Sequence, residues 1–212
     1  MNKYYKLIYT DDDIIVLSKE HGVYVIPDRE NKALPLIDIL RDDFGKVFVT
    51  HRLDYGTGGV MVFARNNISH KNLSSQFENK IIEKTYTALI KGSIYSHSLM
   101  LPIAFGGKGK YKINFKSGKK AVTSFYNISS KNGVSLIKAI PQTGRTHQIR
   151  VHLKALKSPL YQDFLYNSKI DDKRLTLFAS SITFTHPKKN KKMIFSTNLS
   201  SFMQNFINIL EI

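Results

Sequence analysis

The sequence contains no cysteine. This absence excludes disulfide bonds, cysteine-ligated zinc, iron–sulfur clusters and thiol catalysis, and it fits a reducing compartment. No stretch of the chain approaches the ~20 mostly apolar residues that a bilayer span needs, so we expect no membrane segment. Three acidic residues, Asp11, Asp12 and Asp13, interrupt any apolar region after the basic start, which argues against a signal peptide. We therefore expect a cytoplasmic protein.

Acidic residues are scarce in a chain of 212 residues: 16 Asp and Glu stand against 32 Lys and Arg, for a net charge of +16. Residues 1–47 carry seven basic and nine acidic residues, a net charge of −2, whereas residues 48–212 carry 25 basic and seven acidic residues, a net charge of +18. Such an imbalance indicates a polyanionic partner, most simply a nucleic acid. The later part of the chain is expected to supply the binding surface.

The hydropathy pattern is rich in strands. Strands are predicted at 14–17, 23–26, 47–50, 60–64, 84–90, 121–128, 134–140, 175–185 and 193–197. Helices are predicted at 35–44, 69–80, 147–157 and from 200 onward, with Ser69 and Thr146 as N-caps of the second and third. Residues 106–120, with six lysines, are predicted to form a mobile loop.

Asp54 is the first candidate for chemistry, because it lies in a glycine-rich loop between two predicted strands and next to Arg52. A neighbouring guanidinium keeps a carboxylate ionised, so Asp54 could serve as nucleophile or base. It could instead be a turn residue that caps its own backbone, and the local sequence alone favours this simpler role. Tyr86 likewise could be a phenol at a site or one inward aromatic of a strand, and its local sequence favours the core.

Residues 144–150 are the second candidate. Arg145 lies at a predicted helix entrance, where backbone N–H groups attract anions. Arg150 and Lys154 share a basic face of that helix, which either contacts phosphates or is simply solvated. His147 and His152 are five residues apart, about 140° around a helix, so they cannot share a metal ion. We therefore predict no metal site.

Four segments together resemble a known family. Residues 51–59 resemble the loop H-R-L-D-x-x-T-S-G, and residues 84–92 resemble the strand K-x-Y-x-A-x-x-x-G. Residues 143–153 closely match a third motif, and residues 174–187 resemble two closing strands. These motifs occur in this order in RluA-type pseudouridine synthases, and the resemblance covers most of the chain.

The resemblance implies an α+β fold: a mixed, largely antiparallel β-sheet core with flanking helices and a central catalytic cleft. It implies a single catalytic domain over residues 1–212, without a separate N-terminal RNA-binding domain. Asp54 would be the catalytic carboxylate that attacks the target uridine. Tyr86 would stack on the base and help to remove the C5 proton, and Arg145 would pair with Asp54. No cofactor and no metal are expected.

The resemblance also implies a structured RNA, ribosomal or transfer RNA, as the partner of a monomeric enzyme. Six residues are expected to contact this RNA: His51, Arg52, Thr57, Gln148, Arg150 and Lys154. Among them, Arg52 would help to fill the stack that the flipped nucleotide leaves. This part of the expectation accounts for the excess of positive charge, since phosphate contacts offset the cost of extruding a base.

Several positions depart from the family pattern: Glu20, Gly58, Gln162, Asn167 and Phe178. They keep open a second hypothesis, a non-catalytic RNA-binding or ribosome-assembly protein on the same scaffold. A generic DNA-binding protein is a weaker alternative, because the sequence shows no helix-turn-helix, zinc-finger or basic-zipper pattern.

Overall fold

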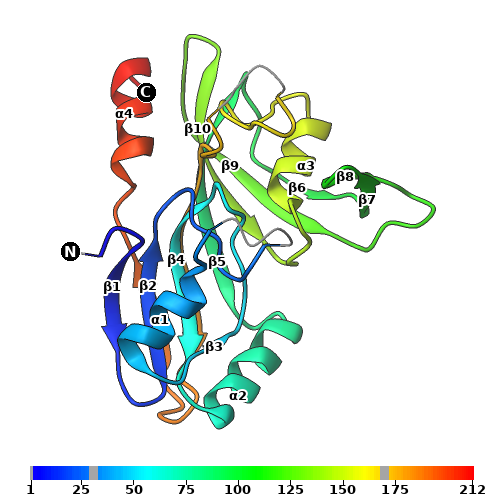
Figure 1. Cartoon of the computed structure of the whole chain (residues 1–212). Helices are drawn as coiled ribbons and strands as arrows, with labels where there is room; N and C mark the ends of the chain where they lie inside the picture. Colours follow the sequence, from blue (N-terminus) through cyan, green and yellow to red (C-terminus); the bar gives the residue numbers. More distant parts are fainter. Residues whose placement is uncertain (1, 29–32, 168–171) are drawn as a thin grey trace. The chain divides into compact units, whose positions relative to one another are not determined.

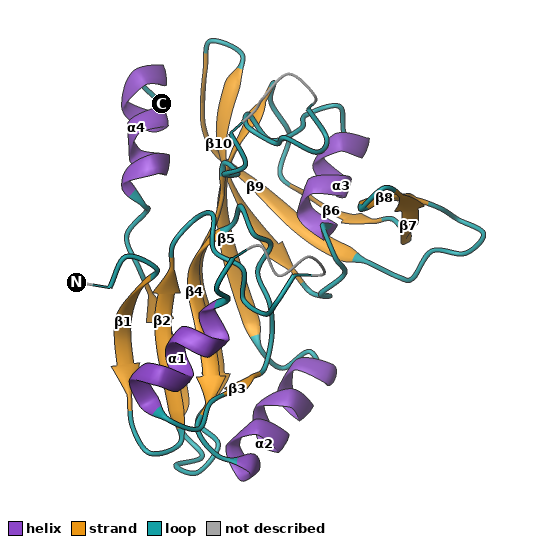
Figure 2. Ribbon diagram, in the orientation of Figure 1, coloured by secondary structure: helices purple, strands orange, loops and turns teal. Residues whose placement is uncertain are grey.

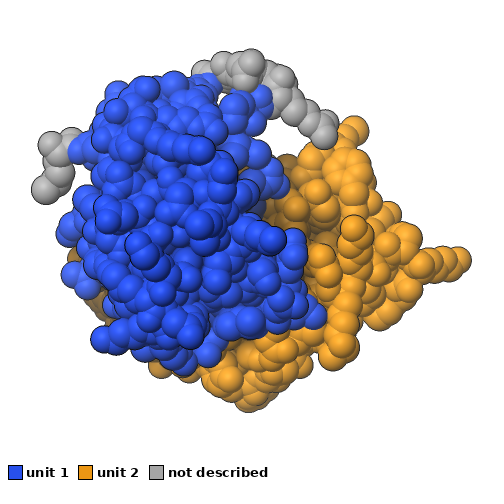
Figure 3. All heavy atoms as spheres, turned by 90° about the horizontal axis from the view of Figure 1, so that it is seen from below, with its two compact units in different colours: residues 1–83, 179–198 blue, residues 84–178, 199–212 orange. Residues whose placement is uncertain are grey.

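The computed structural model describes residues 2–28, 33–167 and 172–212 and divides the chain into two compact units. Unit 1 comprises residues 1–83 and 179–198, and unit 2 comprises residues 84–178 and 199–212 (Figure 3). Each unit is therefore built from two separate segments of the chain. Among the described residues, no helix is both long enough and apolar enough to cross a membrane.

Unit 1 is a sheet flanked by two helices (Figures 1 and 2). Its strands are β1 (Tyr5–Thr10), β2 (Ile14–Lys19), β3 (Phe48–Val49), β4 (Gly58–Ala64), most of β11 (Leu177–Thr185) and β12 (Lys192–Ser196). The order is β1-β2-β4-β11, with β3 paired to β4 and β12 paired to β11. The pairs β1–β2, β2–β4, β3–β4 and β11–β12 are antiparallel.

The two central strands of unit 1 are buried along their whole length, as their continuous apolar runs dictate. Helix α1 (Leu36–Phe44) follows Pro35 and ends at Gly45, whose φ of 77° suits glycine. Helix α2 (Asn67–Glu78) begins after Asn66, whose side chain accepts a hydrogen bond from the Ser69 amide at 2.8 Å. Ser69 is thus inside the first turn, and its prediction as the N-cap was wrong.

Unit 2 contains a second group of strands in the order β5-β10-β9-β6, a separate two-stranded ribbon and two helices. These elements are β5 (Glu83–Lys91), β6 (His97–Met100), β7 (Ile103–Gly107), β8 (Lys110–Ile113), β9 (Val122–Lys131), β10 (Val134–Pro141), α3 (Gln148–Ala155) and α4 (Ser201–Leu210). The pairs β5–β10, β10–β9, β9–β6 and β7–β8 are antiparallel.

Two-residue turns set the register of two hairpins in unit 2. Asn132 and Gly133 join β9 to β10 with φ of 51° and 75°, and Lys108 and Gly109 join β7 to β8 with φ of 49° and 70°. Positive φ at both central residues is the geometry that matches the twist of paired strands. The β7–β8 ribbon corrects the prediction that residues 106–120 form a loop throughout.

Helix α3 covers the main core of unit 2, to which it contributes Ile149 and Leu153. Helix α4 packs through Met203 against Leu89 and Phe178. The aromatic residue at position 178, where the family commonly has histidine, therefore serves the packing of the last helix.

The predicted fold class, a mixed and largely antiparallel sheet core with flanking helices, is confirmed. Besides Ser69 and residues 106–120, three local features differ from the predictions. Residues 23–26 are not a strand; the carbonyls of Tyr24 and Val25 accept hydrogen bonds from Leu36 and Ile37 at the start of α1. Strands β1 and β6 were not predicted. The N-cap of α3 is His147, not Thr146, and its φ of 55° is left-handed.

Candidate active site

Asp54 lies in the loop between β3 and β4 of unit 1. The Asp54 carbonyl accepts a hydrogen bond from the Thr57 amide at 3.0 Å, which closes a tight turn. Leu53 is buried beneath the loop, Arg52 is exposed and Asp54 is half-buried. Leu53 thus fixes the loop to the core, while its neighbours Arg52 and Asp54 stay wholly and partly accessible to solvent.

His51 fixes the first half of this loop. Its Nε2 accepts a hydrogen bond from the Val62 amide at 3.1 Å, and its ring stacks on Phe77 with centroids 4.6 Å apart. Because Nε2 accepts, the ring proton is assigned to Nδ1. His51 was predicted to contact RNA; in the structure its ring joins the loop to β4 and α2.

Lys19 supports the second half of the loop. Its side chain is 1% exposed, and its ammonium group donates to the carbonyls of Glu20 (2.9 Å), Val23 (2.9 Å) and Tyr55 (3.4 Å). Burial lowers the pKa of Lys19 to about 7, against the opposing effect of the Asp54 and Glu20 carboxylates. The residue next to Asp54 is thereby tied to the end of β2. Sequence reasoning missed this residue, although a lysine that ends a fully apolar strand is a signal for it.

Two glycines let β4 start directly after the loop. A Cβ at Gly59, with φ of 117°, would lie 2.2 Å from the Ala179 carbonyl oxygen, so only glycine fits. A Cβ at Gly58 would lie 2.8 Å from the ring of His21, whose Nδ1 contacts the Gly56 carbonyl at 2.7 Å. The departure from serine at position 58 therefore makes room for His21.

Thr57 is 2% exposed, and its hydroxyl is the buried side-chain oxygen that has no hydrogen-bond partner among the described residues. It was predicted to contact RNA. Its burial leaves little surface for such a contact in this structure, and the RNA contact of Thr57 stays a prediction.

The remaining candidates lie in unit 2 and are described within it. Tyr86 is half-buried on β5, opposite Ala139 of β10, and its ring packs against the main core of the unit. Two residues earlier, burial lowers the pKa of Lys84. Arg145 is exposed in the loop before α3, and its Nε donates to the Lys120 carbonyl at 3.1 Å. The pairing of Arg145 with Asp54 stays a prediction.

Gln148 holds the Arg145 loop in place. It is 4% exposed, and its carboxamide oxygen accepts from the Thr143 hydroxyl at 2.6 Å and from the Arg145 amide at 3.0 Å. Its Nε2 donates to the Val122 carbonyl and the Thr123 hydroxyl, both at 2.9 Å. The side chain is thus fully used inside the unit. In this structure Gln148 positions the Arg145 loop, and its predicted RNA contact stays a prediction.

Arg150 is also internal. It is 2% exposed, and its Nε and one terminal nitrogen each donate at 2.8 Å to the two carboxylate oxygens of Asp163, which is 1% exposed. Its guanidinium lies 5.0 Å from the centre of the Tyr166 ring. A bidentate buried pair with an aromatic cover holds Arg150 inside the unit, and its predicted RNA contact stays a prediction. Lys154, in contrast, is exposed, with its ammonium 5.5 Å from the Tyr166 ring.

His147 connects α3 with the β7–β8 ribbon. Its Nδ1 lies 3.0 Å from the Tyr166 hydroxyl, which in turn accepts from the Tyr111 amide at 2.8 Å. The rings of Tyr111 and His147 meet edge to face with centroids 5.4 Å apart. These contacts give a physical reason for the left-handed backbone of His147.

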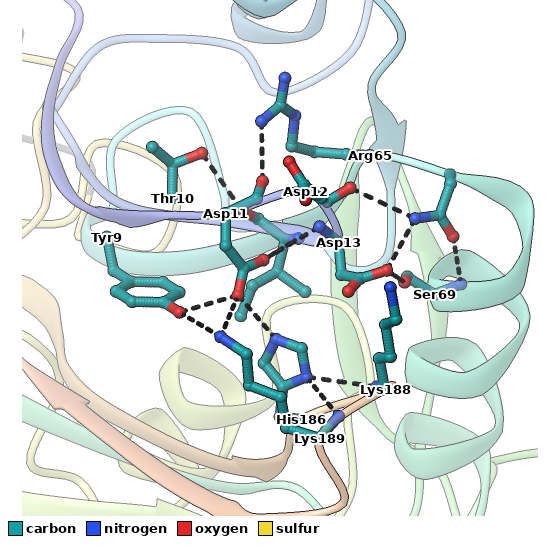
Figure 4. Close-up of polar contacts among 12 residues, drawn as sticks. Tyr9, Thr10, Asp11, Asp12, Asp13, Arg65, Ser69, His186, Lys188 and Lys189 are labelled. Atoms are coloured by element: carbon teal, nitrogen blue, oxygen red, sulfur yellow. Dashed lines mark hydrogen bonds and ion pairs between the residues drawn. The ribbon is translucent and has the colours of Figure 1, made fainter.

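One group in the described part of the chain has the composition of a metal site: Asp11, Asp13 and His186 offer atoms within 4.8 Å of one another. Figure 4 shows Asp11 surrounded by Tyr9, His186 and Lys189, whose donor atoms lie 2.7, 2.9 and 2.8 Å from Asp11 Oδ2. The ammonium group of Lys189 thus already lies beside the Asp11 carboxylate, where a metal cation would bind.

The Asp11 cluster is better explained as an ion-pair network. Partial burial acts to raise the pKa of Asp11, but hydrogen bonds from Lys189, Tyr9 and two backbone amides outweigh it and hold the pKa well below its usual value. The His186 Nδ1 accepts from the amides of Lys188 and Lys189, so the ring proton is assigned to Nε2, which donates to Asp11. The network joins the β1–β2 turn to the β11–β12 turn.

The comparisons with known proteins identify the family. The model of RNA pseudouridylate synthases matches residues 13–155, which include all nine predicted site residues. The chain belongs to the RNA pseudouridylate synthase family. It is 30% identical to the dual-specificity RNA pseudouridine synthase RluA of Haemophilus influenzae, over 92% of this chain and 94% of that protein. The corresponding protein of Yersinia pestis is 33% identical over 89% and 96% of the two chains.

Other members of the family extend beyond the matched region. An uncharacterized RNA pseudouridine synthase of Mycoplasma pneumoniae is 33% identical over 91% of this chain, which spans 66% of that relative. Among solved structures, human RNA pseudouridylate synthase domain containing 4 superposes with a TM-score of 0.80 at 21% identity, over 97% of this chain and 93% of the human one. This likeness supports the pseudouridine synthase fold.

Proposed function

We propose that this chain is an RNA pseudouridine synthase that converts uridines of a structured RNA into pseudouridine. The observation that carries the proposal is the family match over residues 13–155, which includes the Asp54 loop, the Tyr86 strand and the Arg145 loop. The substrate is ribosomal or transfer RNA, and the enzyme acts as a cytoplasmic monomer without cofactor or metal. The net charge of +16 supports a polyanionic substrate.

In the proposed mechanism, Asp54 attacks the target uridine at the sugar or at the base. The bond between N1 of uracil and C1′ of ribose breaks and the uracil turns. A new bond then forms between C5 and C1′, and the bond between Asp54 and the uridine breaks, which returns the free carboxylate. The C5 proton leaves to solvent and N1 gains a proton, so the reaction is an isomerisation in which atoms and electrons balance. Tyr86 stacks on the base and helps to remove the C5 proton, while Arg145 pairs with Asp54.

The structure supports the role of the Asp54 loop through the groups that restrain it. His51 and Leu53 fix its first half, and Lys19 fixes the carbonyl of Tyr55, the residue after Asp54. Such restraint favours attack by the carboxylate on an extruded nucleotide, because a loop that is already ordered loses less conformational entropy in the transition state. Exposed Arg52 and Lys154 are the cations of the predicted set that remain available for RNA.

The test uses RNA labelled with tritium at C5 of uridine. The purified chain should release tritium from unmodified cellular RNA, and Asp54→Asn should abolish the release while RNA affinity stays within about twofold of the wild type, because the substitution preserves shape. A matched control is Asp42→Asn, at an exposed position of α1. Salt-sensitive RNA binding without tritium release by the wild type would instead favour the non-catalytic RNA-binding hypothesis.

A further inference from the structure

The β7–β8 ribbon and the loop after it form a strongly cationic segment. Residues 106–120 contain six lysines and no acidic residue. The lysines are all exposed, and none of them forms an ion pair within the described part of the chain; they are Lys108, Lys110, Lys112, Lys116, Lys119 and Lys120. Figures 1 and 2 show the loop after β8 extending outward from the side of unit 2 that holds α3 and the ribbon. Residues 105–120 are called the lysine-rich segment below.

Two phenylalanines stand among these lysines. Phe105 is 62% exposed and Phe115 is 77% exposed. The Phe105 ring packs T-shaped against Tyr111 with centroids 5.5 Å apart, and this contact still leaves most of Phe105 in solvent. Large apolar side chains placed in water beside positive charges are the arrangement by which proteins bind single-stranded nucleic acids, since bases stack on the rings and phosphates pair with the lysines.

The backbone around Phe115 is fixed by hydrogen bonds, not by burial of the ring. The Asn114 side chain accepts from the amides of Lys116 (2.9 Å) and Ser117 (3.1 Å). The Gly118 amide donates to the Asn114 carbonyl at 2.9 Å, and a Cβ at Gly118 would lie 2.2 Å from that oxygen. The exposed ring is therefore held on an ordered turn, which lowers the entropic cost of binding a base.

The lysine-rich segment is also connected to the Arg145 loop. Tyr111 on β8 touches His147, two residues after Arg145, with ring centroids 5.4 Å apart. At the other end of the segment, the Lys120 carbonyl accepts the hydrogen bond from Arg145 Nε at 3.1 Å. A nucleotide bound on the segment is thus bound next to the backbone that positions Arg145.

We propose that the lysine-rich segment is a docking surface for unpaired nucleotides of the RNA substrate. Phe105 and Phe115 stack on bases, and the surrounding lysines bind the phosphates of the same strand. The partner is a strand with unpaired bases because a duplex keeps the faces of its bases stacked on one another. The inference rests on the proposed function only for the identity of the polymer as RNA.

The test measures the affinity of the full chain for two probes: a fluorescein-labelled oligouridylate of about 12 nucleotides, within the site sizes of single-strand binders, and a blunt RNA duplex of the same length. Phe105→Leu and Phe115→Leu should each weaken oligouridylate binding by about 5- to 100-fold, the loss expected for one stacked base. Duplex binding should stay within about twofold, because the bases of a duplex are already stacked on one another and offer no face to the phenylalanine ring. Leucine keeps the apolar character of the side chain but has no ring face.

Tyr95→Leu is the matched control, since Tyr95 is 93% exposed in the same unit but outside the lysine-rich segment. It should change neither affinity. Lys112→Gln should reduce the slope of log affinity against log salt by about 0.7, the value for one phosphate contact with a single strand. Unchanged oligouridylate affinity in both phenylalanine variants would overturn the proposal, and so would an equal loss for both probes.

Phe115→Leu keeps the test valid if Phe105→Leu disturbs the ribbon through Tyr111, because Phe115 lies outside the ribbon. Tritium release is measured separately for every variant. Failure of the wild type to release tritium would count against the proposed function alone, whereas the affinity pattern decides the docking surface. The two proposals therefore fail independently.

Discussion

Replacing the buried lysine behind the Asp54 loop offers a sharp test of how this loop is held. Lys19→Met keeps the length and most of the volume of the side chain but removes the ammonium group that donates to three carbonyls. The Val23 carbonyl loses its donor in a buried position, which costs about 1–3 kcal/mol. The Tyr55 carbonyl keeps the Gly22 amide at 2.9 Å, so its loss is smaller.

Two effects of opposite sign therefore determine the stability of this variant. The orphaned carbonyls destabilise it, whereas removal of a buried ammonium recovers part of that group's desolvation cost, since burying a charge is unfavourable by several kcal/mol. We expect Lys19→Met to lower the free energy of unfolding by about 1–2 kcal/mol at neutral pH, the net of these effects.

The difference between the wild type and Lys19→Met should grow with pH. Burial lowers the folded-state pKa of Lys19 to about 7, whereas the model value is 10.5. Between these values the unfolded chain binds the proton that the folded chain has released, so the contribution of Lys19 to the free energy of unfolding rises with pH. The slope is at most about 1.4 kcal/mol per pH unit. Below pH 7 both states are protonated and the contribution is constant.

The assay is urea denaturation followed by circular dichroism at about pH 6 to 9, the range that spans the lowered pKa. The exposed Lys6→Met is the control, and its difference from the wild type should stay constant over this range. A Lys19→Met variant as stable as the wild type, or a difference from the wild type that does not change with pH, would refute the reasoning. Tritium release should also fall in Lys19→Met, with RNA affinity retained, because Lys19 acts through the position of the Asp54 loop.

Two further substitutions test contacts that the family pattern did not indicate. Gly58→Ser should destabilise unit 1 by about 1–3 kcal/mol in thermal unfolding, because the new side chain overlaps the His21 ring. The double variant with His21→Ala should recover most of this loss, and a double variant no more stable than Gly58→Ser would contradict the overlap. Arg150→Met should cost about 3–5 kcal/mol in urea denaturation, because it leaves the Asp163 carboxylate buried without its partner, and the double variant with Asp163→Leu should be closer to the wild type. A small loss in Arg150→Met alone would show that the pair is not needed.

The elements with regular periodicity could be predicted from sequence, and those with short or lysine-rich strands could not. The buried runs of β2 and β4 and the Asn-Gly turn between β9 and β10 have local signals that agree with their tertiary environment. The β7–β8 ribbon lacks such a signal, because lysine and glycine disfavour strands on intrinsic grounds. Its strands are held by Ile103, which packs with Ala121 and Val151, a contact between distant parts of the sequence.

The motifs of the site could be predicted from the sequence, but the contacts that surround their side chains could not. The motif containing Asp54 predicts the loop. Lys19, which restrains the loop, lies in another strand, and although its place at the end of an apolar strand is a signal, only the fold shows which carbonyls it holds. Arg150 shows a second limit, since helical periodicity places it on a basic face but does not show what packs there. In the fold, Asp163 and Tyr166 cover Arg150, whereas Lys154 on the same face stays exposed.

Burial of Arg150 also changes where the RNA-binding charge of this chain must lie. An arginine that is paired with a carboxylate inside the protein releases no counterions from RNA, so it adds nothing to the salt-dependent part of affinity. That part must come from exposed cations without acidic partners, and the lysine-rich segment carries six of them within 16 residues. Lysines hold phosphates as point charges without reading bases. If the lysine-rich segment is the proposed docking surface, its contribution to choosing the target comes from RNA shape and from stacking on the exposed rings of Phe105 and Phe115.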